Sequence, residues 1–290
     1  PGAIDLIGFH GQTLSHEPET GHTLQIGHPQ TLADLTAKPV IFDFRRRDVQ
    51  SGGQGAPFLP VYHACRIRAA DLPRPCAVVN IGGVANVTWI GDSPEDIIAF
   101  DTGPGNALLD DLIAEHTALS CDIDGKIAAE GRVDVNILHE LMNHPFFGQK
   151  PPKSLDRNAW QPDIGQLSLS DAAATLTAFT AESIAAARHH FPAPARAWYV
   201  SGGGRHNPVL MQELNARLDG QALNIDTALG TADTTGDLLE AEGFAYLAVR
   251  SLLELPLSFP GTTGVPQPMT GGQLYKPRVK PHSVQETLYH

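Results

Sequence analysis

The stretch CAVVNIGGVANVTWIGDSPEDIIAFDTGPGN, residues 76–106, contains the strongest β pattern of the sequence. Its apolar runs are separated by the turn GDSPED at 91–96, so we expect paired strands, one over 78–88 and one over 97–101. A helical pattern follows directly at 107–116. Strands that alternate with helices, together with an antiparallel strand pair, predict an α/β fold with mixed sheets.

The remaining apolar patterns continue this alternation on both sides. Upstream we expect a strand at 3–9, a hairpin-like stretch through 24–26, a helix at 30–36, a strand at 40–44 and a helix from about Pro57. Downstream we expect a strand in AWYVS at 197–201 and helices at 134–142, 171–190, 208–218 and 237–254. Ser170 is the expected N-cap of the helix 171–190, and Asn207 that of the helix 208–218.

The bulk composition excludes several classes of protein. The 290 residues, 42% of them hydrophobic, suffice for two cores. A formal net charge of −12 disfavours binding to nucleic acid or to an anionic membrane. No apolar run approaches the roughly 20 residues that span a bilayer, and no signal peptide is recognisable. Three cysteines, none in a C-x-x-C pair, indicate small buried residues in a reducing cytoplasm rather than disulfides.

The motif FDTGPGN at 100–106 is the first candidate for chemistry. Asp101 ends an apolar strand, and small residues follow it before the next helix. A carboxylate in that place suits a general base, and the backbone N–H groups of small residues suit a phosphate. The alternative is an aspartate that only caps the turn.

Two further glycine-rich segments also follow strands. In NIGGVANVT at 80–88, the glycine pair indicates either a hairpin that faces phosphate or an ordinary bulged turn. In SGGGRHNP at 201–208, three glycines allow a flat ligand to lie against the backbone. Neither segment is a G-x-G-x-x-G motif, and the sequence has no Walker A motif, which disfavours Rossmann and P-loop chemistry.

Charged and polar groups gather in the segment FDFRRRDVQSGGQGAP at 42–57. Three consecutive arginines suit bidentate contact with a carboxylate or a phosphate. The alternative is a solvated surface cluster that Asp43 and Asp48 neutralise. The earlier segment FHGQTLSH at 9–16 supplies side chains that can bind sugar hydroxyls, although structural hydrogen bonds explain them equally well, and no zinc motif accompanies them.

Glu240, near the start of the helix 237–254, is a candidate acid. Gly, Phe and Leu share its helical face, so we expect a partly desolvated carboxylate that the helix dipole favours. The alternatives are Glu242, on a different face, and a first-turn acid with no further role.

Taken in order, these motifs resemble the anhydro-N-acetylmuramic acid kinase family, and the resemblance runs across nearly the whole chain. The motifs are FHGQTLSH, TLQIG (23–27), DFRRRDVQSGGQGAP, NIGGVANVT, FDTGPGN, DGKIAAEGRV (124–133), PPKS (151–154), SGGGRHNP and the helix of Glu240. The resemblance implies a two-lobed actin/hexokinase-like (ribonuclease H-like) fold, with ATP and sugar bound between the lobes.

The resemblance also implies the reaction. ATP, with Mg²⁺ beside its phosphates, would phosphorylate O6 of 1,6-anhydro-N-acetylmuramic acid while water opens the anhydro bridge at C1. The product, N-acetylmuramic acid 6-phosphate, belongs to peptidoglycan recycling in the cytoplasm. The family implies no nucleic-acid or membrane partner, and a homodimer is a possible assembly.

Residue roles follow from the same resemblance. Asp101 would activate the water, and Glu240 would help to position it. Arg45 would contact the sugar, with His10 and Thr13 nearby. The residues implied at the phosphates and the nucleotide are Asn80, Gly82, Gly83, Thr102, Gly103, Gly202, Gly203 and Asn207. No protein metal ligand is implied.

One departure from the family sets further expectations. The family opens with a phosphate loop, roughly M-S-G-T-S-x-D-G, that this sequence lacks, so we expect a first lobe without its opening strands and a natural protein that extends upstream. We expect the rest of a sugar-side lobe at 1–74, a nucleotide-side lobe at 75–256, and an irregular tail at 257–290 that packs back. Two alternatives to the kinase remain. The first is a non-catalytic sugar or nucleotide binder, or an inactive fragment of such a kinase. The second is a glycoside hydrolase that uses Asp101.

Overall fold

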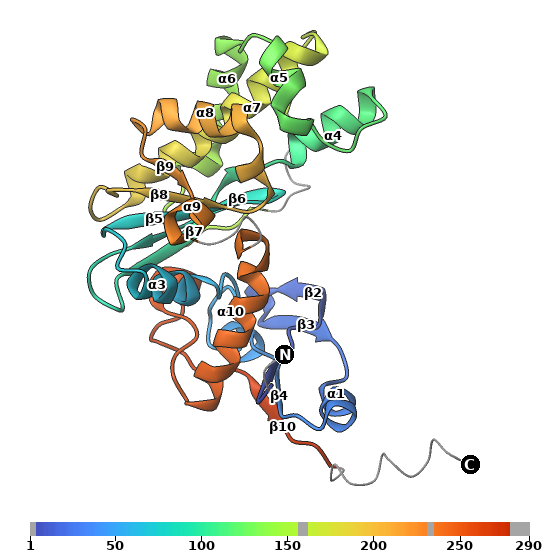
Figure 1. Cartoon of the computed structure of the whole chain (residues 1–290), viewed down its shortest axis with the longest axis vertical. Coiled ribbons are helices and arrows are strands. Elements are labelled where there is room, and N and C mark those ends of the chain that lie inside the picture. Colours follow the sequence, from blue (N-terminus) through green and yellow to red (C-terminus); the bar gives the residue numbers. More distant parts are fainter. Residues whose placement is uncertain (1–3, 156–161, 231–234, 279–290) are drawn as a thin grey trace. The chain divides into compact units, whose positions relative to one another are not determined.

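The computed structural model of the protein describes residues 4–155, 162–230 and 235–278. Contacts divide the chain into two compact units (Figure 1). Unit 1 combines residues 1–63 with 239–290, and unit 2 comprises 64–238. This division differs from the expected lobes, because the last long helix and the tail belong to unit 1.

Unit 1 contains two small sheets. In the first, β4 lies between β1, which runs parallel to it, and β10, which runs antiparallel; β2 and β3 form a separate antiparallel hairpin. The strands are β1 (Ile7–Gly8), β2 (Gln12–Glu17), β3 (His22–Ile26), β4 (Val40–Phe42) and β10 (Gln273–Tyr275). The helices are η1 (Pro18–Thr20), α1 (Pro29–Thr36), α2 (Arg46–Gln50), α11 (Pro260–Thr263), most of α10 (Thr235–Leu252) and the start of α3 (Pro60–Ala69).

The core of unit 1 forms where α10 packs on the strands. Its buried apolar members are Ile41, Phe44, Phe58, Phe244, Leu247, Ala248 and Leu257. The approach of α10 to β1 is so close that a Cβ on Gly8 would lie 2.3 Å from the carbonyl oxygen of Phe244. Glycine at this position therefore lets the helix lie directly against the strand.

Unit 2 is built on a five-stranded mixed sheet in the order β7-β6-β5-β8-β9. Its strands are β5 (Cys76–Ile81), β6 (Val84–Ile90), β7 (Ile97–Pro104), β8 (Trp198–Ser201) and β9 (Ala222–Asn224). Its helices include α4 (Ala107–His116), η2 (Ile123–Gly125), α5 (Lys126–Glu130), α6 (Val135–Met142), η3 (Pro145–Gly148), α7 (Leu169–Ala186), η5 (Ala187–His190), η6 (Gly203–His206), α8 (Pro208–Arg217) and α9 (Ile225–Leu229). The antiparallel pairs β5–β6 and β6–β7 and the parallel pair β5–β8 confirm the α/β class with mixed sheets.

Helices α7 and α8 cover one face of this sheet, and α4, α5 and α6 gather against α7 (Figure 1). Side chains such as Phe100, Ile184 and Leu214 fill the first interface, while Leu112, Leu138 and others fill the second. Alanine dominates α7, which lets neighbouring helices approach it from several sides.

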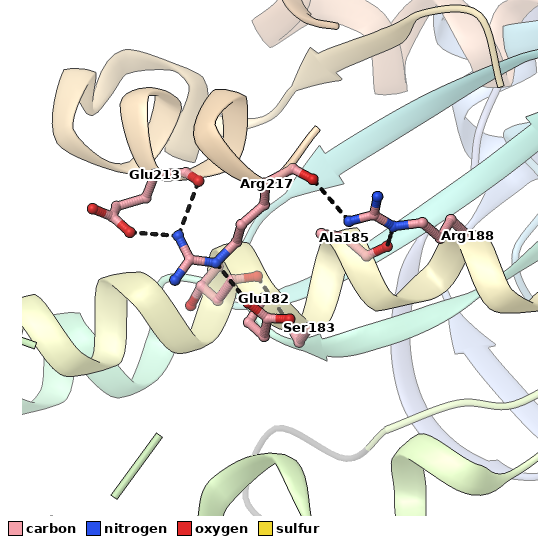
Figure 2. A network of polar contacts seen from close by, with 7 residues as sticks. Glu182, Ser183, Ala185, Arg188, Glu213 and Arg217 are labelled. Carbon is pink, nitrogen blue, oxygen red and sulfur yellow. Dashed lines mark hydrogen bonds and ion pairs between the residues drawn. The ribbon is translucent and has the colours of Figure 1, made fainter. Parts of the chain in front are cut away.

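A polar cluster ties α8 to α7 at the edge of these interfaces (Figure 2). Arg217 on α8 donates from Nε to Glu182 on α7 at 2.8 Å, and from Nη1 to Glu213 one turn earlier. Arg188 donates to the carbonyl oxygen of Arg217 at 2.8 Å. These partly exposed pairs fix the ends of the two helices, although each such pair contributes only about 0–1 kcal/mol.

Several expected elements match the structure, and others need correction. The helix at 107–116 is α4 as expected, and Asn207 caps α8 as expected. The strand expected at 3–9 is a strand only at Ile7–Gly8 among the described residues. The run 78–88, expected as one strand, folds back at Gly82–Gly83 into β5 and β6, because the glycine pair forms the hairpin turn.

The N-cap of α7 is Ser168, not Ser170. The Ser168 hydroxyl accepts a hydrogen bond from the backbone of Asp171 and donates one to its carboxylate, an exchange that Ser170 lies too late in the chain to make. The cysteines also differ from the expectation: Cys76 is buried, but Cys65 is partly exposed and Cys121 is exposed.

Candidate active site

The three glycine-rich turns of unit 2 meet at one edge of its sheet. Because β5, β7 and β8 run in the same direction, their carboxyl ends lie at this edge, where β6 begins. The register pairs Asn80 with Ser201 and Val84 with Pro104. The three glycine-rich motifs, which are far apart in sequence, therefore lie next to one another at this edge.

Backbone hydrogen bonds join two of these turns directly. Asn106 N–H donates to the carbonyl oxygen of Gly82 at 2.7 Å, and Gly105 N–H donates to that of Gly83 at 2.9 Å. The approach is so close that a Cβ on Gly105 would lie 2.2 Å from the Gly82 oxygen. The geometry of this edge is thus fixed by the backbone before any ligand binds.

Some glycines at the edge are required by packing inside the protein. Gly202 has φ of 77°, and a Cβ there would lie 2.6 Å from Asn80 Oδ1 and from the Ile81 carbonyl oxygen. A Cβ on Gly103 would lie 2.9 Å from Ser183, on α7. Glycine at these two positions is explained without a ligand.

Two other glycines have no such explanation. A Cβ on Gly82 would meet nothing closer than 3.6 Å, and one on Gly203 nothing closer than 3.8 Å. Neither residue has a positive φ. Their backbone is therefore open to the approach of a ligand, which is what a phosphate or nucleotide site at this edge requires.

Thr102 and Asn207, both expected near the phosphates or the nucleotide, use their side-chain oxygens in hydrogen bonds within the fold. The buried Thr102 hydroxyl donates to the carbonyl oxygen of Ala85 at 3.1 Å. Asn207 Oδ1 accepts from the backbone of Val209 and Leu210 as the N-cap of α8. Their roles at a nucleotide, like those of Asn80 and Gly83, stay predictions.

The expectation that Asp101 ends its strand is wrong, because β7 continues for three further residues to Pro104. The register still places Asp101 beside the glycine-rich turns, since its partner Asn86 pairs with Asn80 at the end of β5. Its backbone N–H donates to the carbonyl oxygen of Lys153 at 3.0 Å, and its Oδ2 accepts from Leu155 N–H at 2.8 Å. Burial raises the pKa of Asp101 to about 6, while the Leu155 hydrogen bond and the Lys153 charge oppose that rise. A carboxylate with this pKa is ionised at neutral pH and is a stronger base than an exposed aspartate.

The arginine expected at the sugar, Arg45, belongs to a polar cluster in unit 1. Arg45 donates from Nε to His10 Nε2 at 2.8 Å and from Nη1 to the Gly55 carbonyl oxygen at 2.6 Å. The guanidinium also lies over the Phe58 ring at 5.6 Å. Burial lowers the pKa of Arg45 to about 10, and the negative charges of Glu240 and Asp48 oppose that decrease. Arg45 is therefore a cation at neutral pH.

His10 acts as the acceptor for Arg45, which fixes its tautomer. Since Nε2 accepts, the ring proton lies on Nδ1, which donates to the Gly11 carbonyl oxygen at 2.8 Å. Burial, and then the Arg45 charge, lowers the pKa of His10. The ring packs against that of Phe244 on α10 in a tilted arrangement, with 4.7 Å between the ring centres. A neutral histidine thus orients the arginine.

Asp48 supports this cluster, a role that was not foreseen. Its buried carboxylate accepts hydrogen bonds from Gly55 N–H, Ser258 and Thr263. The carboxylate thereby fixes the loop whose Gly55 carbonyl binds Arg45. The hypothesis that Asp48 neutralises surface arginines is wrong for Asp48, whereas Asp43 does pair with the exposed Arg46 at 3.1 Å. The roles of Asp48 and Asp43 differ because residues 258 and 263, far away in sequence, bind Asp48, and a local motif does not show these contacts.

Thr13 is exposed on β2 and lies beside the buried Gln25, whose Nε2 approaches its hydroxyl at 3.4 Å. His16, on the same strand, forms hydrogen bonds with the Thr23 hydroxyl at 2.9 Å and with the Gln54 carbonyl oxygen at 2.9 Å. The histidines of FHGQTLSH are thus hydrogen-bonded to the fold, and His10 also reaches the candidate arginine.

The two glutamates of α10 have different surroundings. Glu242 accepts a hydrogen bond from Tyr62, whereas Glu240 acts electrostatically on both His10 and Arg45. This placement supports Glu240 over Glu242 as the site carboxylate. The expected desolvation is not found, because Glu240 is exposed and lies in the second turn of α10, which begins at Thr235.

The described residues contain no group of three or more His, Cys, Asp or Glu side chains placed to hold a metal ion. Among the helices of the same residues, none is long and apolar enough to cross a membrane.

Comparisons with known proteins agree with these motifs. The family model described as anhydro-N-acetylmuramic acid kinase matches residues 1–277. A protein of that name from Rhizorhabdus wittichii is 50% identical over 278 residues, which cover 95% of this chain and 74% of that protein. Another from Zymomonas mobilis is 48% identical over 274 residues, covering 94% and 73%.

Similar solved structures are more distant. An activator of 2-hydroxyisocaproyl-CoA dehydratase from Clostridium difficile, with bound ADPNP, aligns with a TM-score of 0.40 at 15% identity, covering 67% of this chain and 69% of that one. A xylulose kinase from Rhodospirillum rubrum aligns with a TM-score of 0.41 at 15% identity, covering 68% and 44%.

Proposed function

The chain belongs to the anhydro-N-acetylmuramic acid kinase family and is a kinase, and we propose that its acceptor is 1,6-anhydro-N-acetylmuramic acid. The γ-phosphoryl group of ATP is transferred to O6 while water opens the anhydro bridge at C1. The products are ADP and N-acetylmuramic acid 6-phosphate, an intermediate in the recycling of peptidoglycan amino sugars. The family match over residues 1–277 supports this acceptor.

Asp101 is the proposed general base. The water oxygen forms a bond to C1 as the C1–O6 bond breaks, and Asp101 takes the proton that the water loses. The released O6 then attacks the γ-phosphorus, and the bond to the β-phosphate oxygen breaks to release ADP. A weak base suffices, because C1 becomes cationic as its bond breaks and draws in the water. The buried, ionised carboxylate described above supports this role.

The glycine-rich edge of unit 2 is the proposed site of the ATP phosphates. The open backbone at Gly82 and Gly203 supports it, because N–H groups with no side chain above them can donate to phosphate oxygens. Mg²⁺ would accompany ATP and neutralise phosphate charge when bound. It is usually held by phosphate oxygens, waters and one or two carboxylates, so we assign it no dedicated protein cage.

Arg45 is the proposed contact of unit 1 with the sugar. The muramic acid ether carries a carboxylate, and a preorganised guanidinium suits that group. Nε and Nη1 of Arg45 are bound to His10 and Gly55, and none of the described residues accepts a hydrogen bond from Nη2. That nitrogen is the donor we assign to the substrate, with Thr13 and Glu240 as neighbouring groups.

The test is a product assay with the purified protein. We expect ADP and a sugar 6-phosphate to form in equal amounts when ATP, Mg²⁺ and the anhydro sugar are all present, and neither when one is omitted. Binding of sugar or nucleotide without turnover would identify a non-catalytic binder instead. Opening of the anhydro ring without ATP would identify a glycoside hydrolase.

We also propose that the protein acts in the cytoplasm, where ATP is available, and as a homodimer. Three leucines at the end of α10 and just after it support the second proposal: Leu252, Leu253 and Leu255 are 51%, 62% and 41% exposed. Sedimentation of the wild-type protein and of a variant with these leucines changed to serine tests it, since a dimer that uses this surface dissociates in the variant.

A further inference from the structure

The segment 151–155, which contains the PPKS motif, runs along β7 beside Asp101. It contacts Asp101 twice, through the backbone hydrogen bond from Asp101 N–H to the Lys153 carbonyl oxygen and through the one from Leu155 N–H to Asp101 Oδ2. The second bond fixes the carboxylate and uses one lone pair of Oδ2. None of the described residues donates to Oδ1, so Oδ1 is the oxygen that we assign to the proton of the water.

The side chain of Lys153 anchors this segment. Its Nζ donates to the Phe146 carbonyl oxygen at 3.0 Å and lies 4.4 Å from the centre of the Phe146 ring. The Phe100 ring, next to Asp101 on β7, lies 5.8 Å from Nζ. A cation held between two aromatic rings and a carbonyl is ordered, and each cation–π contact contributes about 0.5–2 kcal/mol.

Lys153 also provides the charge that acts on Asp101. The two side chains make no direct ion pair, but the Lys153 charge favours the ionised form of Asp101. Burial lowers the pKa of Lys153, and the Asp101 charge opposes that decrease. Among the described residues, no other charged group contributes to the pKa of Asp101. β6 places the uncharged Asn86 opposite Asp101, and His190, on η5, interacts electrostatically with Lys153.

We propose that Lys153 is a positioning residue for the base, which holds the segment 151–155 so that Leu155 fixes Asp101 Oδ2 and leaves Oδ1 for the water. The proposal rests on the proposed function, because it takes Asp101 as the base. Lys153 touches neither substrate nor reacting atoms in this account; it acts through the orientation and the ionisation of Asp101.

Neutral variants of Lys153 test this role. Lys153→Met keeps the length of the side chain and removes the charge, Lys153→Gln can still donate to the Phe146 carbonyl, and Lys153→Arg keeps the charge. Lys150→Met, one residue before the segment and exposed, is the matched control. Each is measured by thermal unfolding, by kcat and KM, and by NMR titration of the Asp101 carboxyl carbon.

For the neutral variants we expect kcat to fall about tenfold or more, because a small displacement of a catalytic group lowers the rate of the chemical step. The KM values for ATP and for the sugar should change little. The pKa of Asp101 should rise in these variants and should not change in Lys150→Met, while Lys153→Arg should stay close to wild type. If Lys153→Met does not fold, Lys153→Gln gives the result.

A folded neutral variant with wild-type kcat and an unchanged Asp101 pKa would overturn the proposal. The outcome is separable from the proposed function. If the wild-type protein forms no product but the Asp101 pKa still rises in the variants, the proposed function fails and the positioning role stands. If the wild type is active and the variants show neither change, this inference alone fails.

Discussion

The two units present their candidate groups by different physical means. In unit 1 the site consists of side chains held by other side chains, as His10 and the Asp48-anchored loop hold Arg45. In unit 2 it consists mainly of backbone, exposed where glycine leaves no side chain, with Asp101 as the one charged group that we assign there. Ligand contacts in unit 1 therefore depend on which side chains are present, whereas the phosphate site in unit 2 depends on which side chains are missing, and only its base, Asp101, is a side chain.

The largest effect is expected at Asp101. Asp101→Asn keeps an oxygen that can accept from Leu155 but removes the base, so kcat should fall about a thousandfold, within the usual range for general-base removal. Both KM values should stay within a few-fold of wild type. Steady-state kinetics tests this, and a variant with more than a tenth of wild-type kcat would exclude Asp101 as the base.

The next largest effect is expected at Arg45. Arg45→Met should raise KM for the sugar about 10- to 100-fold, since a hydrogen bond to a charged group contributes about 1.5–3 kcal/mol, and should leave KM for ATP nearly unchanged. Arg46→Met is the matched control, because that arginine is exposed and pairs only with Asp43 among the described residues. Equal effects of the two variants would show that the buried cluster has no special role.

Two adjacent glycines sharpen the contrast within unit 2. Gly202→Ala should lower the free energy of unfolding by about 1–3 kcal/mol, because it strains a positive φ and places a Cβ 2.6 Å from two oxygens. Gly203→Ala should change stability by less than about 0.5 kcal/mol but raise KM for ATP several-fold. Denaturant unfolding and kinetics check both. If instead Gly203→Ala lowers stability and Gly202→Ala raises KM for ATP, then the assignment of Gly202 to packing and of Gly203 to ligand binding is incorrect.

A further effect, seen only when the pH is varied, is expected at Asp101. The pKa of Asp101 is raised in the folded protein, so its protonated form is favoured there, and its contribution to stability is lost as pH rises from about 4 through about 6. Asp101→Asn should therefore be more stable than wild type at pH 8, by about 2 kcal/mol, and should gain nothing at pH 4. The wild-type kcat/KM should fall as pH drops below about 6, where the base is protonated. A stability difference that does not change with pH would contradict the raised pKa.

Local patterns predicted much of unit 2. The helix after FDTGPGN and the cap–proline pair at Asn207 depend on residues adjacent in sequence, and both match the structure. The sequence did not predict that the glycine-rich turns meet at one edge. That arrangement depends on the order and direction of β5, β7 and β8 in the sheet, which local patterns do not contain.

Unit 1 was less predictable, because its contacts join residues far apart in sequence. Asp48 looked like a surface partner for neighbouring arginines until Ser258 and Thr263 were seen to bind it. Likewise the pairing of β10 with β4, which joins residues more than 230 positions apart, is absent from any local pattern, so the tail from 257 onward was expected to be irregular. The segment 151–155 carried a family motif, but nothing local showed that it binds Asp101.

The most direct test of the central claim follows the oxygen of the attacking water. The protein is incubated with ATP, Mg²⁺ and the anhydro sugar in H₂¹⁸O, and the product is analysed by mass spectrometry and NMR. We expect one ¹⁸O atom on C1 of the 6-phosphorylated sugar and none in the phosphate group. Label in the phosphate, or a ring-opened sugar that carries label on C1 but no phosphate, would contradict the account.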